Sequence, residues 1–228
     1  MARIKGSMQD DALIEQALRV YRRYEVEIVQ ALGLCPWAER ARKEGRVAER
    51  VLAVAGDRAL EASLEALGEL AAAEHIEVGL LIYPRIPLAR LPFEHFLSAL
   101  RDADARRHPI GSIPFAMAAF HPDAPADRSD AERFIPFLRR TPDPTVQVVR
   151  RSVLDRIHDS APQGTAFVDL RQLSLEALAA PPARSLRQRI ACHNLEAAER
   201  VGIGEIERRF AEIRRDRDES YERLSLGA

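Results

Sequence analysis

Cysteine is scarce in this chain of 228 residues, in which Cys35 and Cys192 are the only two. Two cysteines are too few for a disulfide framework, and they match no multi-cysteine zinc pattern, so each is treated as a separate thiol. The chain also lacks an apolar run near the roughly 20 residues that cross a bilayer, and it has no hydrophobic signal segment. These absences predict a cytoplasmic protein. Residues 1–8, which end at a second methionine, are typical of an expression scar.

An excess of either charge is missing as well. The 34 Lys and Arg residues nearly balance the 35 Asp and Glu residues, and the two signs are interspersed along the chain. Nucleic acid and anionic membranes are therefore poor candidates for partners. The chain also contains no glycine-rich phosphate loop, Gly-x-Ser-x-Gly elbow, His-Glu-x-x-His or Cys-x-x-Cys motif. This argues against ordinary dinucleotide enzymes, P-loop NTPases, α/β-hydrolases and zincins.

What the chain does contain is enough apolar material for one large core. Hydrophobic residues make up 46% of it, and no charge block or low-complexity linker divides it, so we expect a single domain over residues 1–228. Helical and strand periodicities alternate, which predicts an α/β fold with right-handed crossovers. The expected central sheet is mostly parallel or mixed and flanked by helices, with about five strands, at residues 47–55, 78–83, 113–120, 145–149 and 165–170.

Helical periodicity is clearest at the two ends of the chain. Residues 10–32 carry apolar side chains in steps of three and four, from Leu13 to Ala31, which predicts an N-terminal helix. Two C-terminal helices are expected at residues 185–199 and 205–224. The last one has an apolar stripe that Arg217 interrupts. This stripe is expected to dock on its own domain, with a homodimer through this helix as the alternative.

Cys35 is the first candidate for chemistry. It precedes Pro36, and because proline is favoured at the first position of a helix, the thiol is expected at a helix N-terminus. The helix dipole and unpaired N–H groups stabilise a thiolate there, which makes the sulfur a better nucleophile and a better metal ligand. The alternative is a small buried core thiol.

His121, Pro122 and Asp123 follow the strand expected at residues 113–120, which we interpret as an interior strand. In open α/β sheets ligands bind beyond the carboxyl ends of the strands. A carboxylate two residues from an imidazole can orient the ring, for a general base or for a metal ligand. The alternative is a turn in which Asp123 binds backbone N–H groups.

Arginines follow in a segment rich in proline. Prolines at positions 122, 125, 136, 142 and 144 forbid a long regular element, apart from a helical turn around residues 130–138. Arg139 and Arg140 lie near its end, and a rigidly held guanidinium binds carboxylate or phosphate with two parallel hydrogen bonds. Surface ion pairing is the alternative for either arginine.

Cys192, His193 and Asn194 are adjacent on one predicted helix. Extending the apolar stripe from Leu186 and Ile190 points His193, not Cys192, toward the core, which predicts a structural histidine. Adjacent helical residues point about 100° apart, so Cys192 and His193 are poorly placed to share a metal ion.

At these residues the chain resembles a bacterial family known as domain of unknown function 1415. Its Leu-Cys-Pro-Phe-Ala segment is similar to Leu34-Cys35-Pro36-Trp37-Ala38, and its Phe-His-Pro-Asp motif to Phe120-His121-Pro122-Asp123. An Arg-Ser-Pro-x-Pro stretch before a Leu-Leu-Arg strand resembles residues 140–144 and 148–150, and a late helical asparagine resembles Asn194. The resemblance is good over residues 10–150 and looser beyond, and three ordered motifs are far more specific than one.

The chain departs from the family pattern at two places. Gln147 stands where the family usually has a histidine, and residues 124–134 replace an aromatic-rich stretch. If that histidine is a ligand or a base in relatives, its loss implies an altered or inactive member. The resemblance itself implies no activity.

Three hypotheses of function follow. The first is an enzyme that acts on a small anionic molecule, with Cys35 as nucleophile, His121 as general base, Asp123 as its orienter, Arg140 as anion clamp, and Arg139 and Asn194 as further substrate-binding residues. The second makes Cys35 and His121 ligands of a transition metal or haem. The third is a non-catalytic interaction domain whose partner surface is the last helix.

Overall fold

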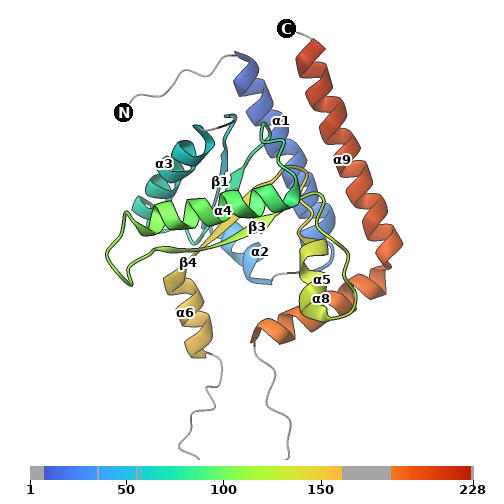
Figure 1. Cartoon of the computed structure of the whole chain (residues 1–228). Coiled ribbons are helices and arrows are strands. Elements are labelled where there is room, and N and C mark those ends of the chain that lie inside the picture. Colours follow the sequence, from blue (N-terminus) through green and yellow to red (C-terminus); the bar gives the residue numbers. More distant parts are fainter. Residues whose placement is uncertain (1–7, 35, 55, 57, 161–185, 227–228) are drawn as a thin grey trace, which may run out of the picture.

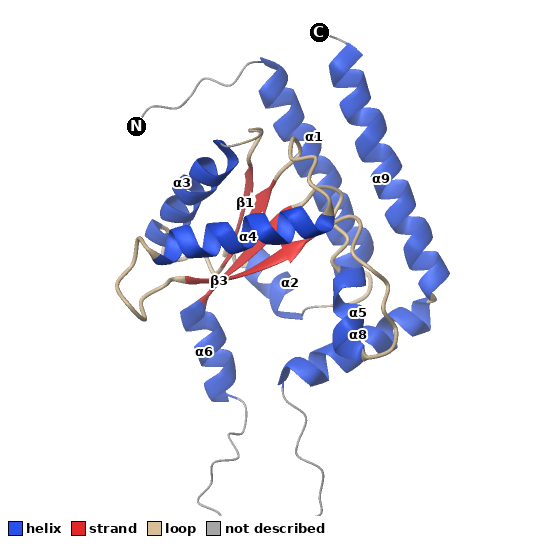
Figure 2. Cartoon of the chain, in the orientation of Figure 1, coloured by secondary structure: helices blue, strands red, loops and turns tan. Residues whose placement is uncertain are grey.

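The structure is a computed structural model that describes residues 8–34, 36–54, 56, 58–160 and 186–226. Its strands are β1 (Val47–Val51), β2 (Val78–Ile82), β3 (Phe115–Phe120) and β4 (Thr145–Arg150). Its helices are α1 (Met8–Tyr24), the π-helix η1 (Glu25–Gln30), α2 (Pro36–Lys43), α3 (Arg58–Ala72), α4 (Arg90–Ala105), α5 (Ala131–Leu138), α6 (Arg151–Ser160), α8 (Leu186–Val201) and α9 (Ile203–Leu226). Helices and strands thus alternate along the chain as predicted (Figure 2).

The four strands form one mixed sheet in the order β1-β2-β4-β3. β1 and β2 are parallel, whereas β4 is antiparallel to both of its neighbours, so β1, β2 and β3 point in the same direction. The described part of the chain therefore has four strands where about five were expected. The fifth candidate, at residues 165–170, lies outside the described residues.

Within the described sheet, the expectation that the strand before His121 is interior was wrong, because β4 inserts between β2 and β3 and leaves β3 at the edge of the described strands. The residue types explain this order. β4 carries three valines, which are β-branched and suit the packed interior of a sheet, while β3 is rich in alanine and only partly buried between its two end residues. Pro114, just before β3, is also best tolerated beside an edge strand.

Helices cover both faces of the sheet (Figure 1). β2 is buried along its whole length, and its side chains alternate between the faces. Leu81 packs with α3 and α4, whereas Leu80 and Ile82 pack with α1, α5 and α9. α9 lies beside α1 in the same chain, so its stripe does dock on the domain, and dimerisation through it stays a prediction.

α8 corrects one detail of the sequence interpretation. Its buried residues include Ala191 and Asn194, while Ile190 and His193 are exposed. The inward face is therefore rotated by one position from the stripe predicted from Leu186 and Ile190, because α8 packs through small alanines rather than through Ile190. His193 is accordingly not a core histidine, and the buried polar side chain is Asn194. Across the described helices, none is both long and apolar enough to span a membrane.

Candidate functional site

A pocket of about 310 Å³ lies at the carboxyl ends of β2 and β3, the edge at which ligands were expected. Three connecting segments form its walls: residues 86–89 after β2, residues 121–123 after β3, and Pro142 and Pro144 before β4. The fourth wall is α9, which contributes Arg214, Arg217 and Asp218. Four of the lining residues are prolines, which restrict the backbone of these walls.

His121 is buried beneath this pocket, with 4% of its surface exposed. Its Nε2 lies 3.0 Å from the carbonyl oxygen of Leu88, and its Nδ1 accepts a hydrogen bond of 3.1 Å from the backbone N–H of Asp123. One neutral tautomer, with the proton on Nε2, satisfies both contacts. The ring therefore ties the turn after β3 to the segment after β2. To act as a base or as a metal ligand, it must first give up one of these bonds.

Asp123 pairs with α9 more closely than with the imidazole. Its Oδ1 lies 2.7 Å from Nη1 of Arg214, whereas its Oδ2 lies 4.0 Å from Nδ1 of His121. The orientation of the ring is set by the backbone N–H of Asp123 rather than by its carboxylate. The carboxylate is half exposed and is thus available to a ligand in the pocket.

Arg140 lies on the far side of the same turn and is held without a carboxylate. Its Nε donates to the carbonyl oxygen of Ala124 at 2.6 Å, and its guanidinium lies 4.7 Å from the ring centre of Phe137. Burial lowers the pKa of Arg140, the negative charges of Glu207 and Asp123 oppose the lowering, and the charge of Arg214 adds to it. Over the described residues, no carboxylate forms an ion pair with it and its two terminal nitrogens have no acceptor. Arg139 lies against a different ring, with its guanidinium 4.9 Å from the centre of Phe120.

The sequence interpretation missed a buried ion pair behind the pocket. Asp143 has no exposed surface; its Oδ1 accepts a 2.9 Å hydrogen bond from Nε of Arg217, and its Oδ2 accepts one of 2.6 Å from the hydroxyl of Tyr221. Burial raises the pKa of the Asp143 carboxyl, and Arg217 and Tyr221 oppose the rise. Arg217 also donates to Asp218 at 2.8 Å. The sequence did contain a signal for this ion pair, because Arg217 interrupts the apolar stripe of the last helix and a cation that faces a core needs a buried partner.

Arg140 and Arg139 lie outside the residues that line this pocket, and the remaining predicted site residues do not line it either. Cys35 lies outside the described residues. Asn194 is buried on α8, which packs against α5, and its Oδ1 has no hydrogen-bond partner among the described residues. No three His, Cys, Asp or Glu side chains of the described ranges gather as a metal site, so ligation through Cys35 and His121 stays a prediction.

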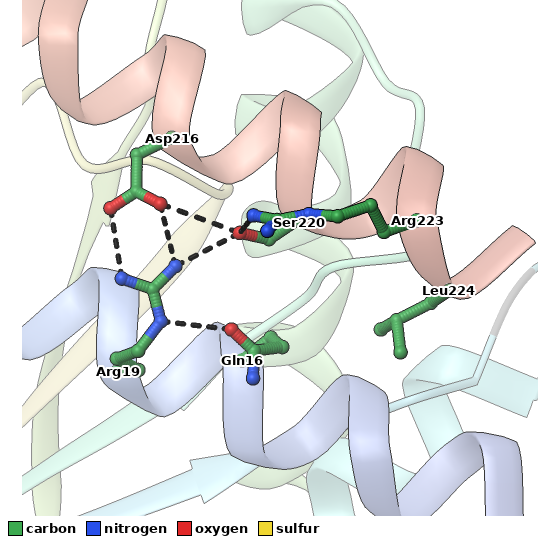
Figure 3. Close-up of a pocket in the computed structure, with 6 residues that line it drawn as sticks. All are labelled: Gln16, Arg19, Asp216, Ser220, Arg223 and Leu224. Atoms are coloured by element: carbon green, nitrogen blue, oxygen red, sulfur yellow. Dashed lines mark hydrogen bonds and ion pairs between the residues drawn. The ribbon is translucent and has the colours of Figure 1, made fainter.

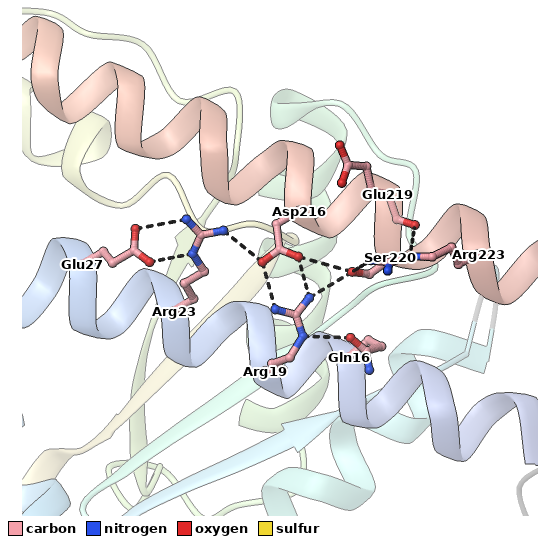
Figure 4. Close-up of polar contacts among 8 residues, drawn as sticks. All are labelled: Gln16, Arg19, Arg23, Glu27, Asp216, Glu219, Ser220 and Arg223. Carbon is pink, nitrogen blue, oxygen red and sulfur yellow. Dashed lines mark hydrogen bonds and ion pairs between the residues drawn. The ribbon is translucent and has the colours of Figure 1, made fainter.

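A second hollow, of about 430 Å³, lies between α1 and α9 (Figure 3). Arg19 of α1 spans it and binds both carboxylate oxygens of Asp216, at 2.6 and 2.9 Å. Figure 4 shows Arg23 adding a third contact to Asp216, at 3.0 Å, while Ser220 accepts a hydrogen bond from Arg19. Hydrogen bonds from Arg19 lower the pKa of the Asp216 carboxyl against the opposing effect of burial, and Arg23 lowers it further. The charged side chains in this hollow are thus paired with one another, and these ion pairs hold α9 on α1.

Comparison with known proteins gives one match. A family model described as "Protein of unknown function (DUF1415)" matches residues 17–183, which is well over half of the chain. The matched region contains His121, Asp123 and Arg140 but ends before α8 and α9. No match was found among curated proteins or among solved structures.

Proposed function

The chain belongs to the DUF1415 family of proteins of unknown function, and because that membership names no reaction, we propose from the geometry that it binds a small anionic molecule at the turn after β3. Arg140 is the main clamp in this proposal, and Arg214 is a second donor from α9. The pocket beside the turn receives the rest of the ligand.

The observation that carries the proposal is the state of Arg140. A guanidinium usually pairs with a carboxylate when it is partly buried, because removing its charge from water is costly. Arg140 is instead held by a carbonyl oxygen and an aromatic ring, and its terminal nitrogens point to no acceptor in the described structure. A held cation with two spare donors suits bidentate binding of a carboxylate or phosphate.

Arg214 supports the same assignment. Its charge lowers the pKa of Arg140, although Glu207 and Asp123 oppose this effect, so an anion between the two arginines would reduce their repulsion further. Among the described residues its side chain is paired with Asp123 alone, and both side chains of that ion pair are half exposed. Exposed pairs contribute only about 0–1 kcal/mol, so a ligand can open this one at little cost.

A catalytic role is the finer part of the proposal. Cys35 is the proposed nucleophile, His121 the base, and Asp123 the residue that orients it, here through its backbone N–H. The rate of Cys35 alkylation against pH, in a Cys192→Ser variant, tests the first of these roles. A thiol pKa at or above about 8.5, the value of free cysteine, would count against an activated nucleophile.

Anion binding is tested by titrating the full chain with glutarate and, separately, with inorganic phosphate, followed by amide NMR. We expect saturable shifts at residues 121–124 and 214–218, and roughly tenfold weaker binding in Arg140→Gln, which removes a charged hydrogen-bond donor. Arg140→Lys should bind with intermediate affinity, because lysine keeps the positive charge but lacks the two parallel donors of the guanidinium. Arg215→Gln is the matched control, since Arg215 is an exposed neighbour on α9. Equal affinities for Arg140→Gln and Arg215→Gln would overturn the proposal.

A further inference from the structure

We infer that the ligand of this pocket is a zwitterion, a small molecule with a cationic amine as well as its anionic group, as in the amino-acid class. This inference rests on the proposed function, because the anionic end is the one that Arg140 and Arg214 hold. It concerns the other end of the ligand, inside the pocket.

The charges that line the pocket are balanced rather than positive. Arg214 and Arg217 are matched by Asp123 and Asp218. The side chains of both carboxylates are more than half exposed, at 54 and 55%. A ligand whose second end carries only an anionic group would meet these carboxylates with like charge, whereas an ammonium group at that end would find acceptors.

Asp218 is the better acceptor for the amine. Its Oδ1 accepts from Nη1 of Arg217, while its Oδ2 has no hydrogen-bond partner in the described structure. Arg217 is itself fixed from behind by buried Asp143, at 2.9 Å, so Asp143 is a positioning residue for this pair. The carboxylate that faces the amine is therefore held in place before the ligand arrives.

Spacing along α9 sets the distance between the two ends of the ligand. Arg214 and Asp218 are four residues apart and lie on one face of the helix, about 6 Å apart along its axis. A carbon chain of a few atoms spans this distance. The pocket volume of about 310 Å³ corresponds to about ten waters at roughly 30 Å³ each, which suits a small metabolite and not a nucleotide.

Two pairs of probes separate the amine from the anion. Glutamate and glutarate share a five-carbon chain with two terminal carboxylates, and glutamate adds one ammonium group. Phosphoethanolamine and ethyl phosphate form the matching pair for a phosphate end. Affinities are measured by amide NMR titration of the full chain, of Asp218→Asn, and of Glu219→Gln, which removes the charge of an exposed neighbour on the same helix.

In at least one pair, we expect the amine-bearing probe to bind about tenfold more tightly, as for a charge-assisted hydrogen bond. Asp218→Asn should abolish this preference without weakening the probe that lacks the amine, and Glu219→Gln should keep it. Which pair shows the preference identifies a carboxylate or a phosphate end. If glutarate and ethyl phosphate bind at least as tightly as their partners, the zwitterion inference is wrong while anion binding stands. If no probe binds, both fail.

Discussion

Replacing Arg150 with methionine should destabilise the protein strongly, although the side chain is only partly buried. Its guanidinium joins the end of β4 to the end of α3. Nε donates to the carbonyl oxygen of Ile76 at 2.9 Å, and Nη2 donates to those of Leu70 and Ala73, at 2.9 and 3.1 Å. Leu70 is in the last turn of α3, where carbonyl groups have no partner within the helix.

The size of the effect follows from these contacts. A hydrogen bond from a charged donor contributes about 1.5–3 kcal/mol, but the three bonds share one donor group and some carbonyls regain water in the variant. We therefore expect a loss of about 3 kcal/mol in the free energy of unfolding. Methionine keeps the apolar stem against the ring of Phe115, which lies 5.2 Å from the guanidinium, so the loss reports the hydrogen bonds.

Urea denaturation measures this loss. With an m-value of about 2 kcal/mol/M, the midpoint should fall by about 1.5 M. Arg150→Lys should lose less, since an ammonium keeps the charge near the helix end but cannot reach all three carbonyls. Arg151→Met is the matched control, because Arg151 is exposed and has no side-chain partner in the described structure. If Arg150→Met changes stability by no more than about 0.5 kcal/mol, as surface substitutions do, the reasoning is refuted.

Other predictions use the same assay. Gly79→Ala should cost about 1–3 kcal/mol, because its methyl would lie 2.5 Å from Cδ1 of Leu70, whereas Gly68→Ala, which meets nothing within 4 Å, should not destabilise. The loss of unfolding free energy in Asp216→Asn should be largest above about pH 5 and should shrink toward pH 2. The pKa of Asp216 is lower in the folded than in the unfolded state, so the charged carboxylate stabilises the fold above the unfolded-state pKa. This stabilisation disappears as the pH falls through the folded-state pKa. A pH-independent loss would contradict this origin. Asp143→Ala should cost about 3–5 kcal/mol by removing the buried partner of the Arg217 guanidinium and leaving it only exposed Asp218 and a carbonyl oxygen, and a loss below 1 kcal/mol would contradict that role.

Local periodicity predicted the N-terminal helix well. Leu13, Val20 and Ile28 are buried as the stripe requires, but Ala31, its last member, is exposed. The reason is the π-helix at Glu25–Gln30, whose wider turn shifts the phase of the residues after it. No pattern in the sequence marks that change of period, because it depends on how the segment packs.

Strand order was harder to predict than the strands themselves. Periodicity placed all four strands of the sheet, but the pairing of β4 with β2 joins residues about 70 positions apart, such as Leu80 and Gln147. Only the packing of the whole sheet decides which strand is interior. The same insertion puts Gln147 in the middle of the sheet, on a different strand from the one that leads into His121. The family histidine expected at this position would therefore not belong to the turn after β3.

In the candidate site, too, local sequence patterns predicted some residues, and those brought in by long-range packing were missed. The rule that ligands bind beyond strand ends led to His121 and Asp123, and the proline-rich segment led to Arg140; the three lie around one turn. It could not lead to α9, which reaches that turn only by tertiary packing.

Arg217 was nevertheless visible as the residue that breaks the stripe of α9. A guanidinium that faces a core must find a carboxylate there, and Asp143, between two prolines, is the one it finds 74 residues earlier. Such a pair adds little net stability compared with apolar packing, since both charges lose their water. Its effect is on position, because it can form only when α9 lies in one register against the turn before β4. That register also places Arg214 opposite Asp123. Arg217, the residue that interrupts the apolar stripe, thus positions α9 so that it lines the pocket as well as packing against α1.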